Sequence, residues 1–179
     1  MWLHEIKHDG YRLMVRRSDD RVRIFTRNGF DWTIRFPRVV EAARRLKVRS
    51  FVIDGEGVIC GPDGVADFAK LHSRAYEDQV ILFGFDLLEL NGEDIRKEPT
   101  EKRKSKLEKI LSRTETDIYF IEHLESDGAA MFKHACKLGL EGIVSKRRDS
   151  PYRSGRCKSW LKIKNPKSPA MMRVEHGTF

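Results

Sequence analysis

Apolar and polar positions alternate over several short stretches of the chain, which predicts a protein rich in β-strands. Residues 21–26 alternate strictly, and the Asn28-Gly29 dipeptide that follows is a strong turn signal. Together with residues 11–16, this stretch predicts an antiparallel hairpin directly after Gly10. Other apolar or alternating runs predict further strands at residues 3–7, 50–60, 80–90, 118–121, 142–146 and 160–164.

Helical spacing of apolar residues occurs between these strands. Within residues 36–47 they recur every three or four positions, so they would share one face of a helix. Three more helices are predicted at residues 66–73, 100–111 and 126–138. Thr100 is a candidate N-cap, and Gly139 suits the end of the last helix. Helices between strands that are joined by hairpins indicate an α+β fold with mainly antiparallel sheets.

Composition narrows the class of protein. The chain has 179 residues, 40% of them hydrophobic, which is enough for one domain with a core. Its 35 basic and 27 acidic residues give a net charge of +8, which favours an anionic partner such as a nucleotide or nucleic acid. No apolar run approaches the roughly 20 residues of a membrane span, and the N-terminus lacks a secretory signal pattern. Three widely spaced cysteines without a CxxC pair argue against a disulfide framework and favour the cytoplasm.

Charged residues occupy strand positions where apolar residues are expected. Three strands carry charged pairs two positions apart, namely Glu5 and Lys7, Asp54 and Glu56, and Lys162 and Lys164. Because alternate residues of a strand share a face, each pair points to one side of its sheet. Such pairs indicate a cleft that suits a nucleoside triphosphate, with lysines on the phosphates and carboxylates on a divalent metal. The alternative is a set of ion-paired strand faces exposed to solvent.

Six short segments with charged residues and glycines follow one another along the chain. They are Lys7-His-Asp-Gly-Tyr-Arg12, Thr26-Arg-Asn-Gly29, Asp54-Gly-Glu56, Phe83-Gly-Phe-Asp86, Glu141-Gly-Ile-Val-Ser-Lys146 and Trp160-Leu-Lys-Ile-Lys164. In this order they resemble the motifs of the covalent nucleotidyltransferases, which comprise ATP-dependent DNA ligases, RNA ligases and mRNA capping enzymes. The residues of these motifs are most similar to those of bacterial ATP-dependent DNA ligases, including ligase domains of the end-joining ligase D type. The resemblance implies two mainly antiparallel sheets, flanked by helices, with a nucleotide cleft between them, as in ATP-grasp-like nucleotidyltransferase domains.

The resemblance also implies a catalytic nucleophile. The amine of Lys7 would attack the α-phosphate of ATP, expel pyrophosphate and keep AMP as a lysyl phosphoramidate. Only an uncharged amine can attack, and Mg²⁺ or Mn²⁺ together with Lys162 and Lys164 would favour that form by repulsion. Glu56 and Glu141 would serve the metal.

The nucleotide-binding residues implied by the resemblance are Glu5, Arg12, Arg27, Glu56, Phe85, Lys146, Arg156, Lys162 and Lys164. Glu5 would lie by the adenine, and Phe85 would stack on it; the alternative for Phe85 is a core aromatic. Arg12 would lie by the ribose, and Arg27 would face the ribose or phosphate side. Glu56 and Glu141 would serve the ribose hydroxyl or the metal. Lys146, Lys162 and Lys164 would contact the phosphates and stabilise charge in the transition state. For Asp9 and Asp54 we weigh two roles equally: contact with the ligand, and a structural role in holding the local turn and orienting neighbours.

Two basic stretches are open to more than one interpretation. Residues 146–156 contain four arginines, which suit either a nucleic-acid backbone or a solvated loop. For residues 102–106 we favour a solvated helix face. His8 is expected to be a packing or surface residue, and Trp32 and Trp160 to be packing residues.

We therefore expect a nucleotidyltransferase (adenylation) domain over residues 1–165, a C-terminal tail over residues 166–179 and no OB domain. The expected enzyme is an ATP-dependent DNA ligase core that acts in DNA repair and recombination on nicked double-stranded DNA. Its expected partners include a separate OB-fold or end-joining protein, and we expect a monomer, associated with the bacterial nucleoid and not with a membrane. The alternatives are a non-catalytic nick- or end-binding module and an RNA ligase.

Overall fold

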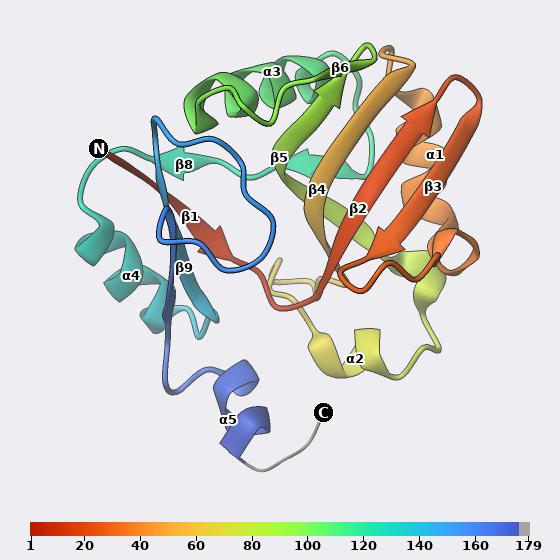
Figure 1. Cartoon of the computed structure of the whole chain (residues 1–179). Coiled ribbons are helices and arrows are strands. Elements are labelled where there is room, and N and C mark those ends of the chain that lie inside the picture. The colour runs from red at the N-terminus through yellow and green to blue at the C-terminus, as the bar shows by residue number, and fades with distance from the viewer. Residues whose placement is uncertain (176–179) are drawn as a thin grey trace.

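The computed structural model describes residues 1–175, whose strands form two sheets (Figure 1). The smaller sheet has four strands in the order β10-β9-β1-β8, and all its neighbours are antiparallel. Its strands are β1 (Trp2–Lys7), β8 (His123–Leu124), β9 (Gly142–Arg147) and β10 (Trp160–Lys164). This sheet brings the first and the last strands of the chain together on either side of β9.

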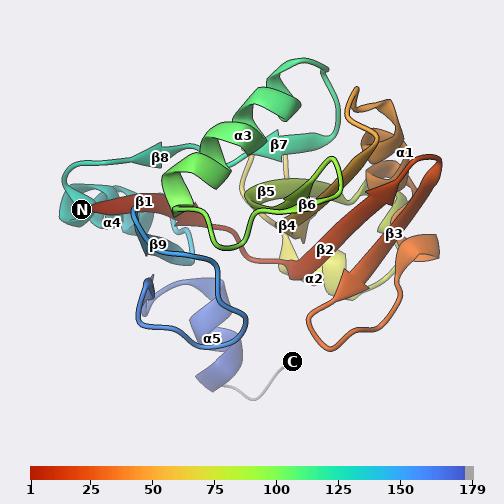
Figure 2. The same ribbon diagram turned by 45° about the horizontal axis from the view of Figure 1, so that its top comes forward.

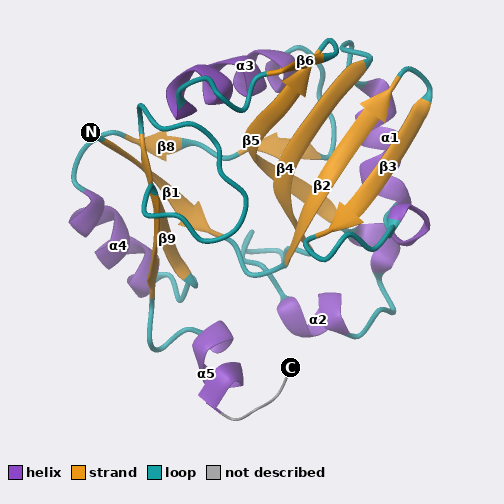
Figure 3. Ribbon diagram, viewed as in Figure 1, coloured by secondary structure: helices purple, strands orange, loops and turns teal. Residues whose placement is uncertain are grey.

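The larger sheet has six strands in the order β3-β2-β4-β5-β6, with β7 beside β5. Its strands are β2 (Tyr11–Ser18), β3 (Arg21–Thr26), β4 (Ser50–Val58), β5 (Ile81–Leu90), β6 (Glu93–Asp94) and β7 (Ile118–Phe120). The predicted hairpin after Gly10 is confirmed as β2 and β3, and only β7 pairs in parallel within the described strands. Figure 3 shows the two sheets as separate groups of strands, as the α+β prediction requires.

Helices flank the sheets, and the predicted ones are confirmed, three with shorter bounds and the one at residues 100–111 with one more residue. They are α1 (Pro37–Arg45), α2 (Phe68–His72), α3 (Thr100–Ser112) and α4 (Gly128–Lys137), with short 3₁₀ turns at Thr33–Arg35 and Glu77–Gln79. The core lies between the larger sheet and helices α1 and α3. Val39 and Ala43 of α1 are fully buried there with Val15 and Ile24 of the sheet. Burial of this apolar surface is the main stabilising contribution to the fold.

The predicted N-cap role of Thr100 is wrong. Pro99 occupies the N-cap position of α3, and Thr100 is a buried helical residue. Its hydroxyl donates a hydrogen bond to the carbonyl oxygen of Ser150, 3.0 Å away. Tertiary contact has therefore replaced local capping, because the start of α3 packs against the segment that follows β9.

Residues 166–179 were expected to be a tail, yet Pro169–Glu175 forms helix α5. Arg173 Nη2 lies 2.6 and 2.7 Å from the two carboxylate oxygens of Asp9, and its guanidinium lies over the ring of Phe68. These contacts attach α5 to the segment that follows β1. Residues 176–179 of the expected tail lie outside the described residues.

The prediction that residues 102–106 form a solvated helix face is wrong for two of its cations. Arg103 and Lys104 are fully buried and continue the buried stripe of Thr100 and Leu107. Arg103 makes a two-pronged ion pair with Asp86 of β5, at 2.8 and 3.0 Å. Lys104 reaches Glu5 of β1 at 2.6 Å, so α3 holds both sheets (Figure 2).

Two glycines allow backbone segments to approach closely. A Cβ atom at Gly10 would lie 2.1 Å from the carbonyl oxygen of Gly57, where the chain leaves β1 and crosses β4. Gly142 has φ +142°, and a Cβ there would lie 2.0 Å from the carbonyl oxygen of Ile163. Side chains are excluded at both positions, which explains the glycines in the two motif segments.

His8 packs as expected, with its ring stacked on Phe83 at 4.0 Å between centroids. Burial and the charge of Lys7 lower the pKa of His8 to about 4, so the ring is neutral. The three cysteines are free thiols. Within residues 1–175 the structure contains no helix with the length and apolarity needed to cross a membrane.

Candidate active site

A cavity of about 470 Å³ lies between the two sheets. Residues of β1, β9 and β10 line it from the smaller sheet, and residues of β2 to β5 line it from the larger one. The predicted site residues that line it are Glu5, Lys7, Arg12, Arg27, Glu56, Phe85, Lys146 and Lys162. Glu5 and Lys7 both line the cavity, as their shared strand face predicts, whereas the other two pairs contribute one residue each, Glu56 and Lys162.

Three predicted site residues do not line the cavity. Glu141 follows α4 and reaches the cavity only through Lys7. Lys164 is exposed at the end of β10, beyond Lys162. Arg156 is exposed in the loop between β9 and β10, which lies in front of the gap between the sheets in Figure 1.

Lys7 and Glu141 form an ion pair at the edge of the cavity. Lys7 Nζ lies 2.7 Å from Glu141 Oε1, and their side chains are 18% and 10% exposed. The pair arises because β1 and β9 are antiparallel neighbours, with Lys7 opposite Gly142. The lysine amine is thus held away from open solvent, next to a carboxylate that can accept its proton.

Glu56 is the second carboxylate near this amine, and it makes no hydrogen bond or ion pair within the described residues. Burial raises its pKa to about 7, the charge of Lys7 opposes the rise, and Glu141 adds to it. Asp54, the other acid of the pair in β4, is fully buried and points to Arg12 instead. Glu56 is therefore an under-compensated acid on the cavity wall.

The donor set fits a divalent cation that is shared with a polyphosphate. Mg²⁺ is commonly held by one or two carboxylates together with substrate phosphates. Glu56 and Glu141 are electrostatically coupled and both face Lys7. No cluster of three or more His, Cys, Asp or Glu side chains suited to a metal occurs in the described range of the chain. A metal here would need oxygen atoms from a bound ligand.

One end of the cavity is cationic. Partial burial lowers the pKa of Lys162, and repulsion from Lys7, Arg12 and Arg27 lowers it further. Neither Arg27 nor Lys162 has a carboxylate partner in the part of the chain that the structure describes. Unpaired cations that repel one another attract an anionic ligand. This end suits phosphate groups.

Arg12 is held in place by Asp54 and Tyr152. Its guanidinium donates to both carboxylate oxygens of Asp54, at 3.1 and 2.6 Å, and to the hydroxyl of Tyr152 at 3.2 Å. The Tyr152 hydroxyl in turn donates to Asp54 at 2.8 Å. Burial and the charge of Asp54 raise the pKa of Tyr152, so the phenol stays protonated. Asp54 thus orients its neighbour, one of the two roles weighed for it.

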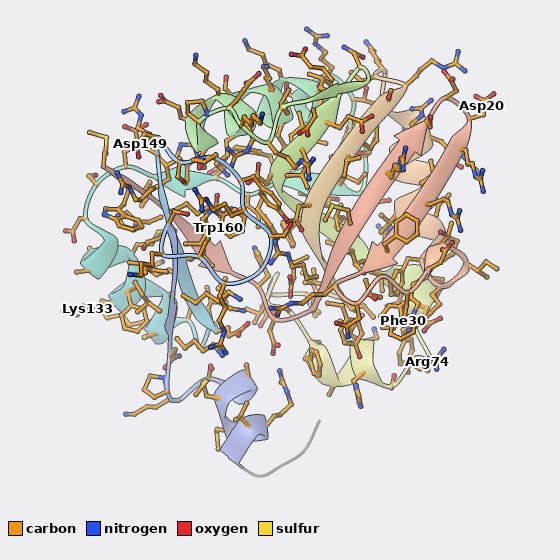
Figure 4. The ribbon with its side chains drawn as sticks, in the orientation of Figure 1. Asp20, Phe30, Arg74, Lys133, Asp149 and Trp160 are labelled. Carbon is orange, nitrogen blue, oxygen red and sulfur yellow. The ribbon has the colours of Figure 1, made fainter. Side chains whose placement is uncertain are left out.

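The other end of the cavity is aromatic. Phe85 and Trp160 meet edge to face at 5.8 Å, and Lys146 Nζ lies 4.1 Å from the Trp160 ring centroid. Trp160, labelled in Figure 4, lies between the two sheets. Lys146 is buried, lies 2.8 Å from Glu5, and donates to the carbonyl oxygen of Phe85 at 3.3 Å. Its ammonium group therefore belongs to the aromatic end in this structure, although phosphate contact was expected.

Sequence reasoning missed Lys104 and Tyr152. Lys104 was hidden in a basic run, but its spacing from Thr100 and Leu107 places it on the apolar stripe of α3. A cation on such a stripe signals a buried acid elsewhere in the chain. Tyr152 follows Pro151 in a loop, and no local pattern indicates that it packs on Arg12.

Comparison with known proteins decides the family. A family model described as "ATP dependent DNA ligase domain" matches residues 1–164. The chain belongs to this family. It is 41% identical over 167 residues to the multifunctional non-homologous end joining protein LigD of Pseudomonas aeruginosa. The aligned region covers 91% of this chain and 20% of that protein. A probable DNA ligase of Dictyoglomus turgidum is 35% identical over 177 residues, with 89% of this chain and 30% of that protein covered.

Solved ligase structures share the fold of this ligase domain. The ligase domain of Mycobacterium tuberculosis LigD matches with a TM-score of 0.80 and 35% identity, over 91% of this chain and 54% of that one. Mycobacterial DNA ligase D complexed with ATP and MES matches with a TM-score of 0.80, 36% identity and the same coverage. The predicted nucleotidyltransferase fold and the resemblance to DNA ligases are confirmed. The chain spans about a fifth of the LigD proteins and about half of the solved ligase domains.

Proposed function

We propose that this chain is the nucleotidyltransferase part of an ATP-dependent DNA ligase, which forms a lysyl-AMP intermediate on Lys7. The observation that carries the proposal is the placement of the Lys7 amine, in a cavity and 2.7 Å from Glu141. Membership of the ligase family and the relative complexed with ATP support the choice of nucleotide.

The proposed reaction forms one bond and breaks another. Lys7 Nζ bonds to the α-phosphorus of ATP, the bond from that phosphorus to the pyrophosphate oxygen breaks, and pyrophosphate leaves with the electron pair. Glu141 is the group placed to take a proton from the lysine amine. Lys162 and Arg27 would hold the phosphates in line and stabilise their charge. When bound, Mg²⁺ or Mn²⁺ supplies charge neutralisation, with Glu56 and Glu141 as its protein ligands.

DNA would receive the AMP. In the proposal, AMP passes from Lys7 to a 5′-phosphate at a nick in double-stranded DNA, and a 3′-hydroxyl then displaces it. Arg156 and its neighbours in the loop between β9 and β10 would contact the DNA backbone. A separate OB-fold or end-joining protein, a monomeric state and a nucleoid-associated, cytoplasmic location remain predictions that follow from this function.

The test is intact-mass analysis of the purified protein after incubation with ATP and Mg²⁺. We expect a gain of one AMP that pyrophosphate removes. Lys7→Arg keeps a cation beside Glu141 but cannot attack, because a guanidinium stays protonated. It should therefore give no adduct, whereas Lys167→Arg, an exposed control, should react normally. An adduct on Lys7→Arg, or none on the unmodified chain, would refute the proposal.

A non-catalytic nick-binding module is the second candidate. The exposed arginines of the loop between β9 and β10 favour it, since they could bind DNA without any nucleotide chemistry. Nicked-duplex binding that Lys7→Arg leaves unchanged, together with no AMP adduct on the unmodified chain, would support this alternative.

A further inference from the structure

The carboxylate of Glu5 is buried between two lysines from different elements. Glu5 Oε1 lies 2.6 Å from Lys104 Nζ of α3, and Glu5 Oε2 lies 2.8 Å from Lys146 Nζ of β9. All three side chains are at most 2% exposed. Burial alone would raise the pKa of Glu5, but the charges of Lys146 and Lys104 lower it below its usual value. The carboxylate is thus held ionised and anchored at both oxygens.

Glu5 belongs to the end of the cavity where a base fits. Lys146 connects it to Phe85 and Trp160, the aromatic pair, and Lys146 lies over both rings. The phosphates of a nucleotide would lie at the opposite, cationic end, by Lys7 and Lys162. An aromatic wall takes up the flat face of a base. Glu5 lines the same cavity. With the face of the base on the aromatic wall, the Glu5 carboxylate would contact the polar edge of the base.

Lys104 differs from the other two groups because it does not line the cavity. Its ammonium donates to the carbonyl oxygen of Ile121 at 2.9 Å and lies 4.4 Å from the ring centroid of Phe120. These contacts fix the lysine behind Glu5, on the side away from the ligand. Lys104 therefore acts on a bound nucleotide only through residues that it contacts, and two of these, Glu5 and Ile121, line the cavity.

We propose that Lys104 is a positioning residue that makes the cavity select a 6-aminopurine over a 6-oxopurine, an inference that rests on nucleotide binding in the proposed function. An ionised carboxylate only accepts hydrogen bonds, so it pairs with the amino group of adenine and repels the carbonyl oxygen of guanine. Without Lys104, Glu5 loses one anchor and one of the two charges that keep it ionised. A carboxyl that can rotate and take up a proton can also donate to the guanine oxygen.

The test compares binding of ATP and GTP by Lys104→Met and by the unmodified chain. Lys104→Met leaves Glu5 and Lys146 as a balanced ion pair, so the variant is expected to fold. We expect the ratio of ATP to GTP affinity to fall by about tenfold, the size of one lost hydrogen bond to a charged group. Lys106→Met is the matched control, because Lys106 lies on the same helix and its only carboxylate partner in the described chain is Glu98.

A second pair of variants separates positioning from general damage. In a Glu5→Gln background, Lys104→Met should have no further effect on the ATP to GTP ratio, since the carboxylate through which it acts is gone. An unchanged ratio in Lys104→Met overturns the inference, and so does an equal effect in both backgrounds. If Lys104→Met does not fold, the double variant Glu5→Gln/Lys104→Met, which keeps the net charge of the cluster, is compared with Glu5→Gln.

Direct binding distinguishes this inference from the proposed catalytic function. If the unmodified chain binds ATP in preference to GTP but forms no AMP adduct, only the catalytic proposal fails, and the affinity ratios still decide the role of Lys104. If it forms the adduct equally well from ATP and GTP, the catalytic chemistry stands and the inference about Lys104 is wrong.

Discussion

Glu56 is the acid whose ionisation the fold opposes. Its pKa rises from 4.5 to about 7, first because the carboxyl is buried and then because Glu141 lies near. Between these two pH values the folded protein keeps a proton that the unfolded chain has released. Stability therefore falls as pH rises from 4.5 to 7, and the loss is complete above pH 7. A group kept at such a cost to stability is typical of a functional site.

Glu56→Gln should therefore stabilise the protein and impair its reaction. At pH 8 we expect the free energy of unfolding to increase by about 3 kcal/mol, because the pKa rises by about 2.5 units and each unit corresponds to about 1.4 kcal/mol. At pH 4.5 the variant and the unmodified protein should be equally stable. Urea unfolding of both proteins at the two pH values checks the expected free energies of unfolding. The Glu56→Gln variant should also form less AMP adduct than the unmodified protein. A stability gain that is the same at both pH values would contradict the assigned pKa.

At the level of elements, helix α3 is the link between the two walls of the cavity. Its buried stripe places Arg103 against Asp86 of β5 and Lys104 against Glu5 of β1. Both interactions are inaccessible to water, so each cation is needed to compensate the carboxylate that it faces. The apolar residues of the same stripe then hold α3 on the larger sheet. Two strands of the site are thus fixed by one helix that contributes no residue to the cavity.

Arg103→Met tests the contribution of this helix. Removal of one partner leaves Asp86 as an uncompensated buried charge, and we expect a loss of about 3–5 kcal/mol in the free energy of unfolding. Asp86→Asn/Arg103→Met should recover part of that loss, since it removes both charges. Lys102→Met, at an exposed position on the same helix, should change stability little. Equal losses for Arg103→Met and Lys102→Met in urea unfolding would show that the buried pair is unimportant.

At the level of the whole molecule, the cavity exists because the chain closes two sheets against each other. The loop between β9 and β10 lies across their junction, and the Tyr152 amide donates to the carbonyl oxygen of Arg96 at 2.8 Å. The same loop exposes Arg153 and Arg156, neither of which has a carboxylate partner in residues 1–175. One loop therefore holds Arg12 of the cavity wall through Tyr152 and presents positive charge to the outside.

Arg153→Ala/Arg156→Ala should weaken binding to nicked DNA and reduce its dependence on salt. If each arginine neutralises one phosphate, the slope of log K against log salt should fall by about 2. Lys133→Ala/Lys137→Ala removes the same charge from α4, on the far side of the smaller sheet (Figure 4), and should leave the slope unchanged. Equal effects of the two double variants would mean that binding follows net charge and not this loop.

Local sequence pattern was enough to predict most elements and most of the residues that line the cavity. Alternation with period two placed β3 and β10 at their observed bounds, because successive side chains of a strand point to opposite faces whatever its neighbours are. The ordered motifs named the family and most of the residues that line the cavity. Gly10 and Gly142 were part of those motifs, although the reason for them, close backbone approach, is visible only in three dimensions.

Tertiary structure alone decided which charges meet. The partners Glu5 and Lys104, Asp86 and Arg103, and Asp9 and Arg173 are far apart in sequence, and no local period relates them. A buried cation is stable only when a carboxylate arrives from another element, so a basic run looks solvated until the fold supplies its partner. Helix α5 was expected to be a tail for the same reason, because Arg173 meets its carboxylate partner Asp9 only in the folded protein. Lys146 lies at the aromatic end because its carboxylate partner there is Glu5. Periodicity is a property of one segment, whereas charge compensation is a property of two.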